Sequence, residues 1–185
     1  MAKQYHAQDI VDLVLALSGF FRISLSQGKE FITLEQEVLM VKNYLDIQKV
    51  RYEDLFEYKT EIEEGLGNYM VLKICLQPLV ENAIIHGVSP KEEGGSIRIV
   101  VRQKEMRLHI VIGDDGIGMT EEELQQLKSR LKTDDARHSG IGLGNVYRRI
   151  TAMYADGNFE IYSKKNAGTV IFIDIPCREE TGDMT

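Results

Sequence analysis

Residues 114–119 read Asp-Asp-Gly-Ile-Gly-Met and follow closely on an apolar, β-branched run, Arg107 to Ile112, that is typical of a strand. Two glycines two positions apart allow a backbone to turn sharply and to approach a ligand closely. An acidic side chain at a strand end, such as Asp114, can accept a hydrogen bond from an amine such as the exocyclic amino group of adenine. A tight turn with two solvated aspartates is the alternative interpretation of these residues alone.

Two further segments place polar residues where a ligand could bind. Residues 81–87, Glu-Asn-Ala-Ile-Ile-His-Gly, end an expected helix, and Asn82 and His86 share one helical face because they are four residues apart. Residues 140–145, Gly-Ile-Gly-Leu-Gly-Asn, precede another expected helix, whose N-terminal N–H groups and dipole attract anions. A polar helix end facing water and a flexible hinge are the respective alternatives.

The composition is that of an ordinary folded protein. The chain has 185 residues, of which 43% are hydrophobic and 28% charged, and its length suits one domain or slightly more. A net charge of −7 argues against a general nucleic-acid binder. There is no apolar run of about 18 residues, so we expect no membrane contact by this segment. Cys75 and Cys177 form no CxxC pair and are expected to be buried thiols in a reducing compartment.

The pattern of the chain changes near residue 55. Before it we expect one helix that begins at Asp9 and is ended by Gln27-Gly28-Lys29, and a second that begins after a capping box of Thr33 and Gln36 and ends near Tyr52. The second helix is expected to bury a single stripe of side chains: Leu34, Val38, Val41, Leu45 and Gln48. The expected division of the chain is a helical region at 1–55, a second region at 56–178 and a polar tail at 179–185.

Residues 56 to 177 combine strand and helix patterns. The expected strands are 56–62, 96–102, 107–112, 159–163 and 169–175, the last four forming two hairpins. The expected helices are 69–86, a short one from Thr120 and 144–154. Pro78 requires a late start or a kink in the first of these helices. This mixture predicts an α+β fold, a two-layer α/β sandwich in which a mixed, largely antiparallel sheet carries helices on one face, preceded by an N-terminal helical segment.

The order of the three polar segments is more specific than any one of them. A helical Asn, a strand ending in Asp-x-Gly-x-Gly, a polar stretch and Gly-x-Gly-x-Gly entering a helix together resemble the GHKL (HATPase_c, Bergerat-fold) ATP-binding family. That family includes histidine kinases, type II topoisomerases, mismatch-repair ATPases and heat-shock chaperones. Gly168-Thr169 before the last strand resembles the final sequence box of the family. The resemblance covers roughly residues 56 to 177.

This resemblance implies ATP and Mg²⁺ as cofactors and a role for each matching residue. Asn82 would coordinate the magnesium ion that bridges the phosphates. Asp114 would accept a hydrogen bond from the adenine amino group, while Gly116 and Gly118 would let the adenine ring lie close. Thr169 would contact the region of Asp114.

The resemblance also implies a phosphate-binding turn and a lid. The residues of the turn would be Gly140, Gly142, Leu143 and Gly144. His86 would lie near the phosphates or the ribose. Residues 119–139 would form the ATP lid, whose basic side chains are Lys128, Arg130, Lys132, Arg137 and His138. For each of these bases a solvated helix face is the alternative.

A narrower resemblance points to one branch of the family. Residues 76–87, Leu-Gln-Pro-Leu-Val-Glu-Asn-Ala-Ile-Ile-His-Gly, closely resemble the LytS-like sensor histidine kinases, as do residues 142–149. Residues 17–25, 34–37 and 43–52 resemble the linker of the same family between the phosphoacceptor and the ATP-binding domain. Topoisomerases and chaperones place a water-activating glutamate four residues before the magnesium Asn, and that position is Pro78 here. The resemblance therefore implies a protein-histidine kinase that transfers the γ-phosphoryl group of ATP to a histidine and then to an aspartate of a response regulator. Glu81 is the implied catalytic base, or else it only orients a magnesium-bound water.

One part of the family pattern does not occur in this sequence. The phosphoacceptor histidine of the family lies in an Asn-Pro-His-Phe segment, and this context surrounds none of the four histidines, His6, His86, His109 and His138. We therefore expect the C-terminal piece of a longer protein, a natural short protein being the alternative. The longer protein would be a bacterial membrane sensor with this piece in the cytoplasm, and the piece alone would not phosphorylate itself.

The first helix bears on the expected partners. Its apolar residues Leu13, Leu17, Phe20 and Phe21 would pack on a partner helix in a homodimer, or else on the ATP-binding domain of the same chain. The phosphoacceptor helix of the same protein is a second expected partner. Two other function classes stay open at this point. They are a GHKL ATPase of another class and a catalytically inactive module for nucleotide binding or dimerisation.

Overall fold

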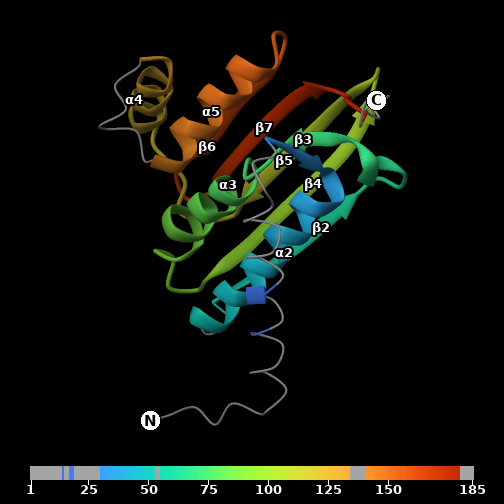
Figure 1. Ribbon diagram of the computed structural model, residues 1–185. Helices are drawn as coiled ribbons and strands as arrows, with labels where there is room; N and C mark the ends of the chain where they lie inside the picture. The colour runs from blue at the N-terminus through green and yellow to red at the C-terminus, as the bar shows by residue number, and fades with distance from the viewer. Residues whose placement is uncertain (1–13, 15–16, 19–29, 53–54, 134–140, 180–185) are drawn as a thin grey trace, which may run out of the picture.

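The computed structural model describes residues 14, 17–18, 30–52, 55–133 and 141–179. A five-stranded sheet forms one layer, and helices cover one of its faces (Figure 1). The strands follow the order β2 (Phe56–Ile62), β4 (Gly95–Lys104), β5 (Arg107–Asp114), β7 (Gly168–Pro176) and β6 (Asn158–Lys164). The helices are α2 (Leu34–Arg51), η1 (Leu66–Asn68), α3 (Gln77–Asn82), η2 (Ala83–Val88), α4 (Glu121–Lys132) and α5 (Ile141–Met153). The predicted two-layer α+β sandwich is confirmed.

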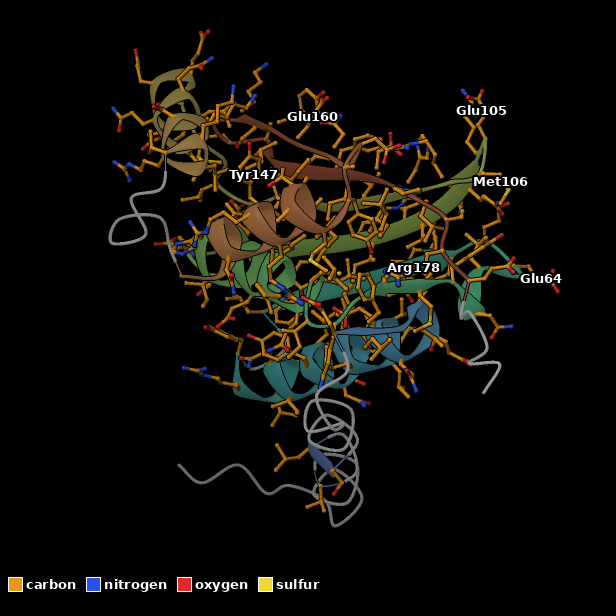
Figure 2. The ribbon with its side chains drawn as sticks, turned by 45° about the horizontal axis from the view of Figure 1, so that its top comes forward. Glu64, Glu105, Met106, Tyr147, Glu160 and Arg178 are labelled. Atoms are coloured by element: carbon orange, nitrogen blue, oxygen red, sulfur yellow. The ribbon has the colours of Figure 1, made fainter. Side chains whose placement is uncertain are left out.

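The sheet is mixed, and its pairing follows from the two hairpins. β4 pairs with β5 and β6 with β7 in antiparallel register, β5 and β7 are also antiparallel, and β2 joins β4 in parallel. Both predicted hairpins are therefore confirmed. The β4–β5 turn is made by Glu105 and Met106, whose side chains project from the tip of the sheet (Figure 2). The other end of β5 is Asp114, so the tip and the polar segment lie at opposite ends of the strand.

Helix α2 begins and packs as its sequence predicts. Thr33 Oγ1 accepts a hydrogen bond from the Gln36 N–H, and the Gln36 side chain accepts one from the Thr33 N–H. The five residues of the predicted stripe are all buried: Leu34, Val38, Val41, Leu45 and Gln48. The four apolar residues of this stripe belong to the same core cluster as Phe56 of β2 and the inward side chains of the sheet. The helix predicted from Asp9 to residues 27–29 lies outside the described residues, apart from the helical Val14, Leu17 and Ser18.

The predicted helix at 69–86 is wrong in its first half. Met70–Leu72 forms strand β3, which pairs antiparallel with β1 (Phe31–Thr33). Helix α3 then begins at Gln77 with Pro78 in its first turn, where a missing N–H costs nothing. Of the two outcomes that Pro78 predicted, a late helix start or a kink, the late start is the one that occurs. The last part of the segment is η2, a π-helix rather than an α-helix.

Two smaller predictions also need correction. Helix α5 begins at Ile141 and not at Gly144, so Gly142 and Gly144 belong to its first turn. A glycine suits position 142 because α5 lies close to α3 there. A Cβ on Gly142 would be only 3.1 Å from the Cβ of Pro78. Cys177 is half-buried rather than buried, and both described cysteines are free. Among the described helices, none is long and apolar enough to cross a membrane.

Candidate functional site

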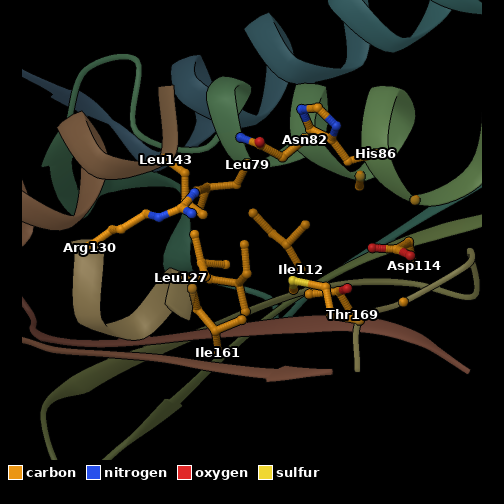
Figure 3. A pocket seen from close by; sticks show the side chains of 15 residues that line it. Leu79, Asn82, His86, Ile112, Asp114, Leu127, Arg130, Leu143, Ile161 and Thr169 are labelled. Carbon is orange, nitrogen blue, oxygen red and sulfur yellow. The ribbon is translucent and has the colours of Figure 1, made fainter. Parts of the chain in front are cut away.

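A cavity of about 350 Å³ lies between the sheet and the helices α3, α4 and α5 (Figure 3). Its volume falls in the range of small-molecule sites. Six of the predicted site residues line it: Asn82, His86, Asp114, Gly118, Leu143 and Thr169. Asp114 and Thr169 lie at one end, whereas Arg130 and Leu143 lie at the other (Figure 3). The fold thus brings together predicted residues from α3, η2, the 114–119 segment, α5 and β7 around one cavity.

Asp114 is the polar group of the first end. Its Oδ1 accepts a hydrogen bond from the Gly116 N–H at 2.9 Å. Burial raises the pKa of Asp114 to about 6, although hydrogen bonds from the backbone of Gly116 and Thr169 act in the opposite direction. A half-buried carboxylate with unused acceptor capacity, facing an apolar cavity, is suited to a ligand that donates a hydrogen bond.

Asp115, its neighbour, points elsewhere and has a structural role. Its two carboxylate oxygens accept hydrogen bonds from the N–H of Ser96 at 2.6 Å and from the Ser96 hydroxyl at 2.8 Å. Partial burial opposes ionisation, but the bonds from Ser96 prevail and hold the pKa of Asp115 below its usual range. Only Asp114 of the pair is therefore available to a ligand in the cavity.

The glycines of the 114–119 segment allow close packing of backbones. A Cβ on Gly116 would lie 2.1 Å from the carbonyl carbon of Gly87, so Gly116 packs directly on η2 and does not line the cavity. Gly118 has φ +56°, and a Cβ there would lie 2.0 Å from the carbonyl oxygen of Lys164. The Ile117 N–H donates to Gly87 O at 3.0 Å. The turn is thereby fixed to η2 on one side and to the β6–β7 hairpin on the other.

Ser163 connects this turn to Thr169, a role that no sequence motif indicates. Its hydroxyl lies 2.9 Å from Thr169 Oγ1, donates to Gly168 O at 3.0 Å and accepts from the Met119 N–H at 2.9 Å. Thr169 therefore lies beside Asp114, as predicted, in direct register with it across β5 and β7. Serines on strands are common, and only the threonine was marked by a motif.

Asn82, the last residue of α3, presents an amide to the cavity. Its Nδ2 donates to Pro78 O at 2.6 Å, which leaves Oδ1 as the atom able to bind a cation or accept a hydrogen bond. The described residues contain no group of three or more His, Cys, Asp or Glu that could hold a metal ion. A metal ion here would therefore take few protein ligands, as Mg²⁺ does when phosphates supply the others.

Glu81 precedes Asn82 but does not line the cavity. It is half-buried on the side of α3 that faces α2, where it acts on Tyr44. Burial, followed by the charge of Glu81, raises the pKa of Tyr44 to about 12. The Glu81 carboxylate is thus next to a cavity residue in sequence but acts on α2 in space.

The second end of the cavity is formed by α5 and α4. Because α5 begins at Ile141, the N–H groups of its first turn have no partners within the helix. Leu143 lines the cavity and Gly144 is buried, whereas Gly140 lies outside the described residues. Arg130 on α4 is the one predicted lid base that reaches the cavity within the described part of the chain.

The other lid bases are placed differently. Lys128 lies with its ammonium 5.6 Å from the centre of the Tyr162 ring, and Lys132 is exposed beyond it. Arg137 and His138 lie outside the described residues. Helix α4 itself begins as predicted, because Thr120 and Glu123 form a reciprocal capping box.

The apolar wall of the cavity was not predicted as part of the site. It consists of Leu79, Ala83, Ile112, Met119, Leu127, Ile161 and Ile171. These side chains have the same periodicity as core residues, so no sequence pattern separates the two groups. Their contribution is a dry surface against which a flat ring can lie.

Comparison with known proteins decides the family. Residues 67–179, more than half of the chain, match the model described as histidine kinase-, DNA gyrase B-, and HSP90-like ATPase, and residues 1–56 match a histidine kinase model. The chain belongs to the histidine kinase-, DNA gyrase B- and HSP90-like ATPase family. The predicted GHKL resemblance is therefore confirmed, and with it the ATP-binding character of the domain.

The relatives of this family member are sensor kinases. It is 30% identical over 181 residues to the sensor histidine kinase YesM of Bacillus subtilis, covering 97% of this chain and 30% of YesM. It is 32% identical over 175 residues to the sensor protein kinase HptS of Staphylococcus aureus, covering 93% of this chain and 33% of HptS. The chain thus spans about a third of the length of the curated relatives it matches.

Solved histidine kinases share the fold of this family member. The catalytic domain of histidine kinase ThkA superimposes with a TM-score of 0.61 at 18% identity, over 81% of this chain and 97% of that one. The histidine kinase domain of the blue-light activated kinase from Erythrobacter litoralis gives a TM-score of 0.58 at 16% identity, over 94% and 76%. At these identities the likeness establishes the architecture alone.

Proposed function

We propose that this chain is the ATP-binding catalytic domain of a two-component sensor histidine kinase, with ATP and Mg²⁺ as cofactors. The observation that carries the proposal is the polarity of the cavity, which has a half-buried carboxylate at one end and an amide, a cationic side chain and a helix N-terminus at the other. That arrangement matches a molecule with a hydrogen-bond-donating ring and an anionic tail, as ATP is.

In this proposal the adenine lies at the Asp114 end. Asp114 accepts a hydrogen bond from the exocyclic amino group, and the ring packs between Ile112 of the sheet and Leu127 of the lid helix. Gly118 lines the cavity beside the proposed ring position, and a Cβ there would collide with Lys164 O and displace the turn. These contacts would select adenine through its exocyclic amino group and the flat shape of its ring.

The triphosphate extends towards Asn82, Arg130 and the first turn of α5. Free N–H groups at a helix N-terminus and a guanidinium both favour anionic oxygens. Asn82 Oδ1 would hold Mg²⁺ together with phosphate oxygens, and the ion would neutralise charge on the phosphates when bound. His86, exposed on η2 one turn beyond Asn82, would lie along the same edge.

The acceptor would be a histidine rather than water. Pro78 occupies the position from which a glutamate could activate water, so the described site offers no base there. Glu81 is the proposed base. It would accept the proton that the attacking imidazole loses, while the bond between the γ-phosphorus and the bridging oxygen breaks and ADP leaves with that oxygen. The Glu81 side chain acts on Tyr44 of α2 and does not line the cavity.

The longer protein and its partners follow from the relatives, and we propose them on that basis. YesM and HptS are named as sensor kinases and are about three times as long as the matching part. The phosphoryl group would pass from the histidine to an aspartate of a response regulator. The complete protein would be a membrane-anchored homodimer whose cytoplasmic part includes this chain.

Calorimetric titration of a non-hydrolysable ATP analogue, with and without Mg²⁺, tests the nucleotide site. We expect Mg²⁺-dependent binding by the wild type. In Asp114→Asn an N–H₂ group replaces one carboxylate oxygen and would face the amino group of the adenine, so we expect a loss of about 2 kcal/mol in binding free energy. Asp156→Asn, the same chemical change at an exposed position, should bind like the wild type. No binding by folded wild type would contradict the proposal.

Phosphoryl transfer to a supplied fragment carrying an Asn-Pro-His-Phe segment tests the kinase step. We expect labelled fragment with the wild type, a fall in rate of about 100-fold or more in Glu81→Gln, and unchanged nucleotide affinity. Glu64→Gln, on an exposed loop, is the matched control. Binding without transfer would indicate an inactive module, and steady ATP hydrolysis by the chain alone, lost in Glu81→Gln, would indicate a GHKL ATPase of another class.

A further inference from the structure

Glu37 is a carboxylate completely buried in helix α2, and it is outside the cavity. Its Oε2 accepts a hydrogen bond from the N–H of Ile74 at 2.9 Å. Its Oε1 accepts two more, from the N–H groups of Cys75 at 2.8 Å and Leu76 at 2.9 Å. Burial raises the pKa of Glu37, whereas these three backbone donors lower it. Three consecutive amides that converge on one carboxylate form an anion-binding arrangement.

The three amides belong to a short segment, residues 73–76, that directly precedes α3. Ile74 has φ +56°, a left-handed conformation that is costly for a β-branched residue. Such a conformation persists only where the surrounding structure enforces it. The hydrogen bonds to Glu37 are therefore part of what holds the 73–76 segment in this shape.

Helix α5 holds the same segment from the other side. Arg149 Nη1 donates to Lys73 O at 2.8 Å and to Ile74 O at 3.4 Å. The charge of Arg149 also favours the ionised form of Glu37. The 73–76 segment thus forms the junction between α2, through Glu37, and α5, through Arg149. The first turn of α5 in turn forms the second end of the cavity.

The chain from this junction to Asn82 is short, and hydrogen bonds connect its parts. Leu76 O accepts hydrogen bonds from the N–H groups of Leu79 and Val80, both at 3.1 Å, and these close the first turn of α3. Pro78 O then accepts the bond from Asn82 Nδ2. Any displacement of residues 74–76 therefore shifts Pro78, which packs on Gly142 of α5, and the Asn82 amide with it.

The Asp114 end of the cavity has separate supports. Asp114 is held by the register of β5 with β7, which involves neither α2 nor α3, and Gly116 also packs on Gly87 of η2, the helix that follows α3. We propose that Glu37 is a positioning residue for the phosphate end of the ATP site: it fixes the start of α3 to α2, and thereby sets Asn82 against α5 and couples α2 to nucleotide binding. This inference rests on the function proposed above.

The substitution Glu37→Gln tests the inference, because it replaces one acceptor oxygen by an N–H₂ group that faces backbone donors. Calorimetry with a Mg²⁺-bound ATP analogue reports on both ends of the cavity, whereas ADP without Mg²⁺ depends mainly on the adenine end. We expect the affinity for the Mg²⁺-bound analogue to fall about tenfold or more, as for supports behind a metal ligand, and the affinity for Mg²⁺-free ADP to change little. Leu45→Val, also buried in α2, is the control for destabilisation alone and should leave both affinities unchanged.

The inference is overturned if Glu37→Gln weakens both nucleotides equally, or if it lowers only the melting temperature, as Leu45→Val does. Wild type that binds neither nucleotide would overturn the proposed function itself, and the inference with it. Should Glu37→Gln fail to fold, Arg149→Met addresses the same segment from α5. The same selective loss of the Mg²⁺-bound analogue is then expected, and an equal loss of both nucleotides would overturn the inference.

Discussion

Asp114 and Asp115 are adjacent in sequence and opposite in environment. Asp115 is bound by Ser96 and is easily ionised, whereas Asp114 is half-buried beside an apolar wall and is hard to ionise. A buried carboxylate whose acceptor capacity is not filled lowers the stability of the free protein. A hydrogen-bond donor in a ligand would relieve that cost, so the same feature that destabilises the empty domain favours nucleotide binding.

The pH dependence of stability should expose this cost. The pKa of Asp114 is about 6 in the folded domain, above its ordinary value of 3.8. The folded state therefore favours the protonated form, and the stabilisation present below pH 3.8 is lost as the pH rises through 6. At pH 8 we expect Asp114→Asn to be more stable than wild type by about 1–2 kcal/mol, and near pH 4 the difference should vanish. Urea unfolding at the two pH values measures this. A saturating ATP analogue should offset this difference at pH 8, since it binds the variant about 2 kcal/mol more weakly and therefore stabilises the variant less than the wild type.

The starts of helices α2 and α4, which depend on contacts close in sequence, agree with the sequence predictions, whereas strand β3, which depends on a distant partner, does not. The capping boxes at Thr33 and Thr120 involve contacts three residues apart, so the sequence shows them directly. The helix predicted from Tyr69 fails because Met70–Leu72 pairs with Phe31–Thr33, nearly forty residues away. Apolar residues in such a stretch fit a helix and a buried strand equally well, and only the partner strand decides between them.

The elements of the site show the same division. Asn82, Asp114 and Thr169 could be predicted because each belongs to a recognisable motif, and the structure places all three around one cavity. Glu37 could not be predicted. It follows the start of α2 in the run Leu-Glu-Gln-Glu, where acidic residues normally face water and favour the helix dipole. Its burial is created by the 73–76 segment, whose left-handed turn at Ile74 has no sequence signature.

For the whole molecule, the change of pattern near residue 55 does not separate two cores. Leu34, Val41 and Leu45 of α2 are completely buried in the cluster that also contains Phe56 and Leu79. Strand β1 adds a pairing with β3, and Glu37 adds three hydrogen bonds to the 73–76 segment. We therefore propose that α2 folds together with the ATP-binding region.

Two shortened chains test this proposal. Each large apolar side chain of α2 contributes about 1.5–3 kcal/mol by burial, so the four in its stripe together rival the total stability of a domain, about 5–15 kcal/mol. A chain of residues 30–185 should unfold in one cooperative thermal transition and bind the ATP analogue, because β1, α2 and Glu37 are retained. A chain of residues 56–185 should show no cooperative transition, since the inner faces of α3 and β2 would be exposed to water. Circular dichroism on heating, with calorimetry on the same samples, measures both properties. Cooperative unfolding and nucleotide binding by the shorter chain would mean that α2 is an accessory to the fold rather than part of its core.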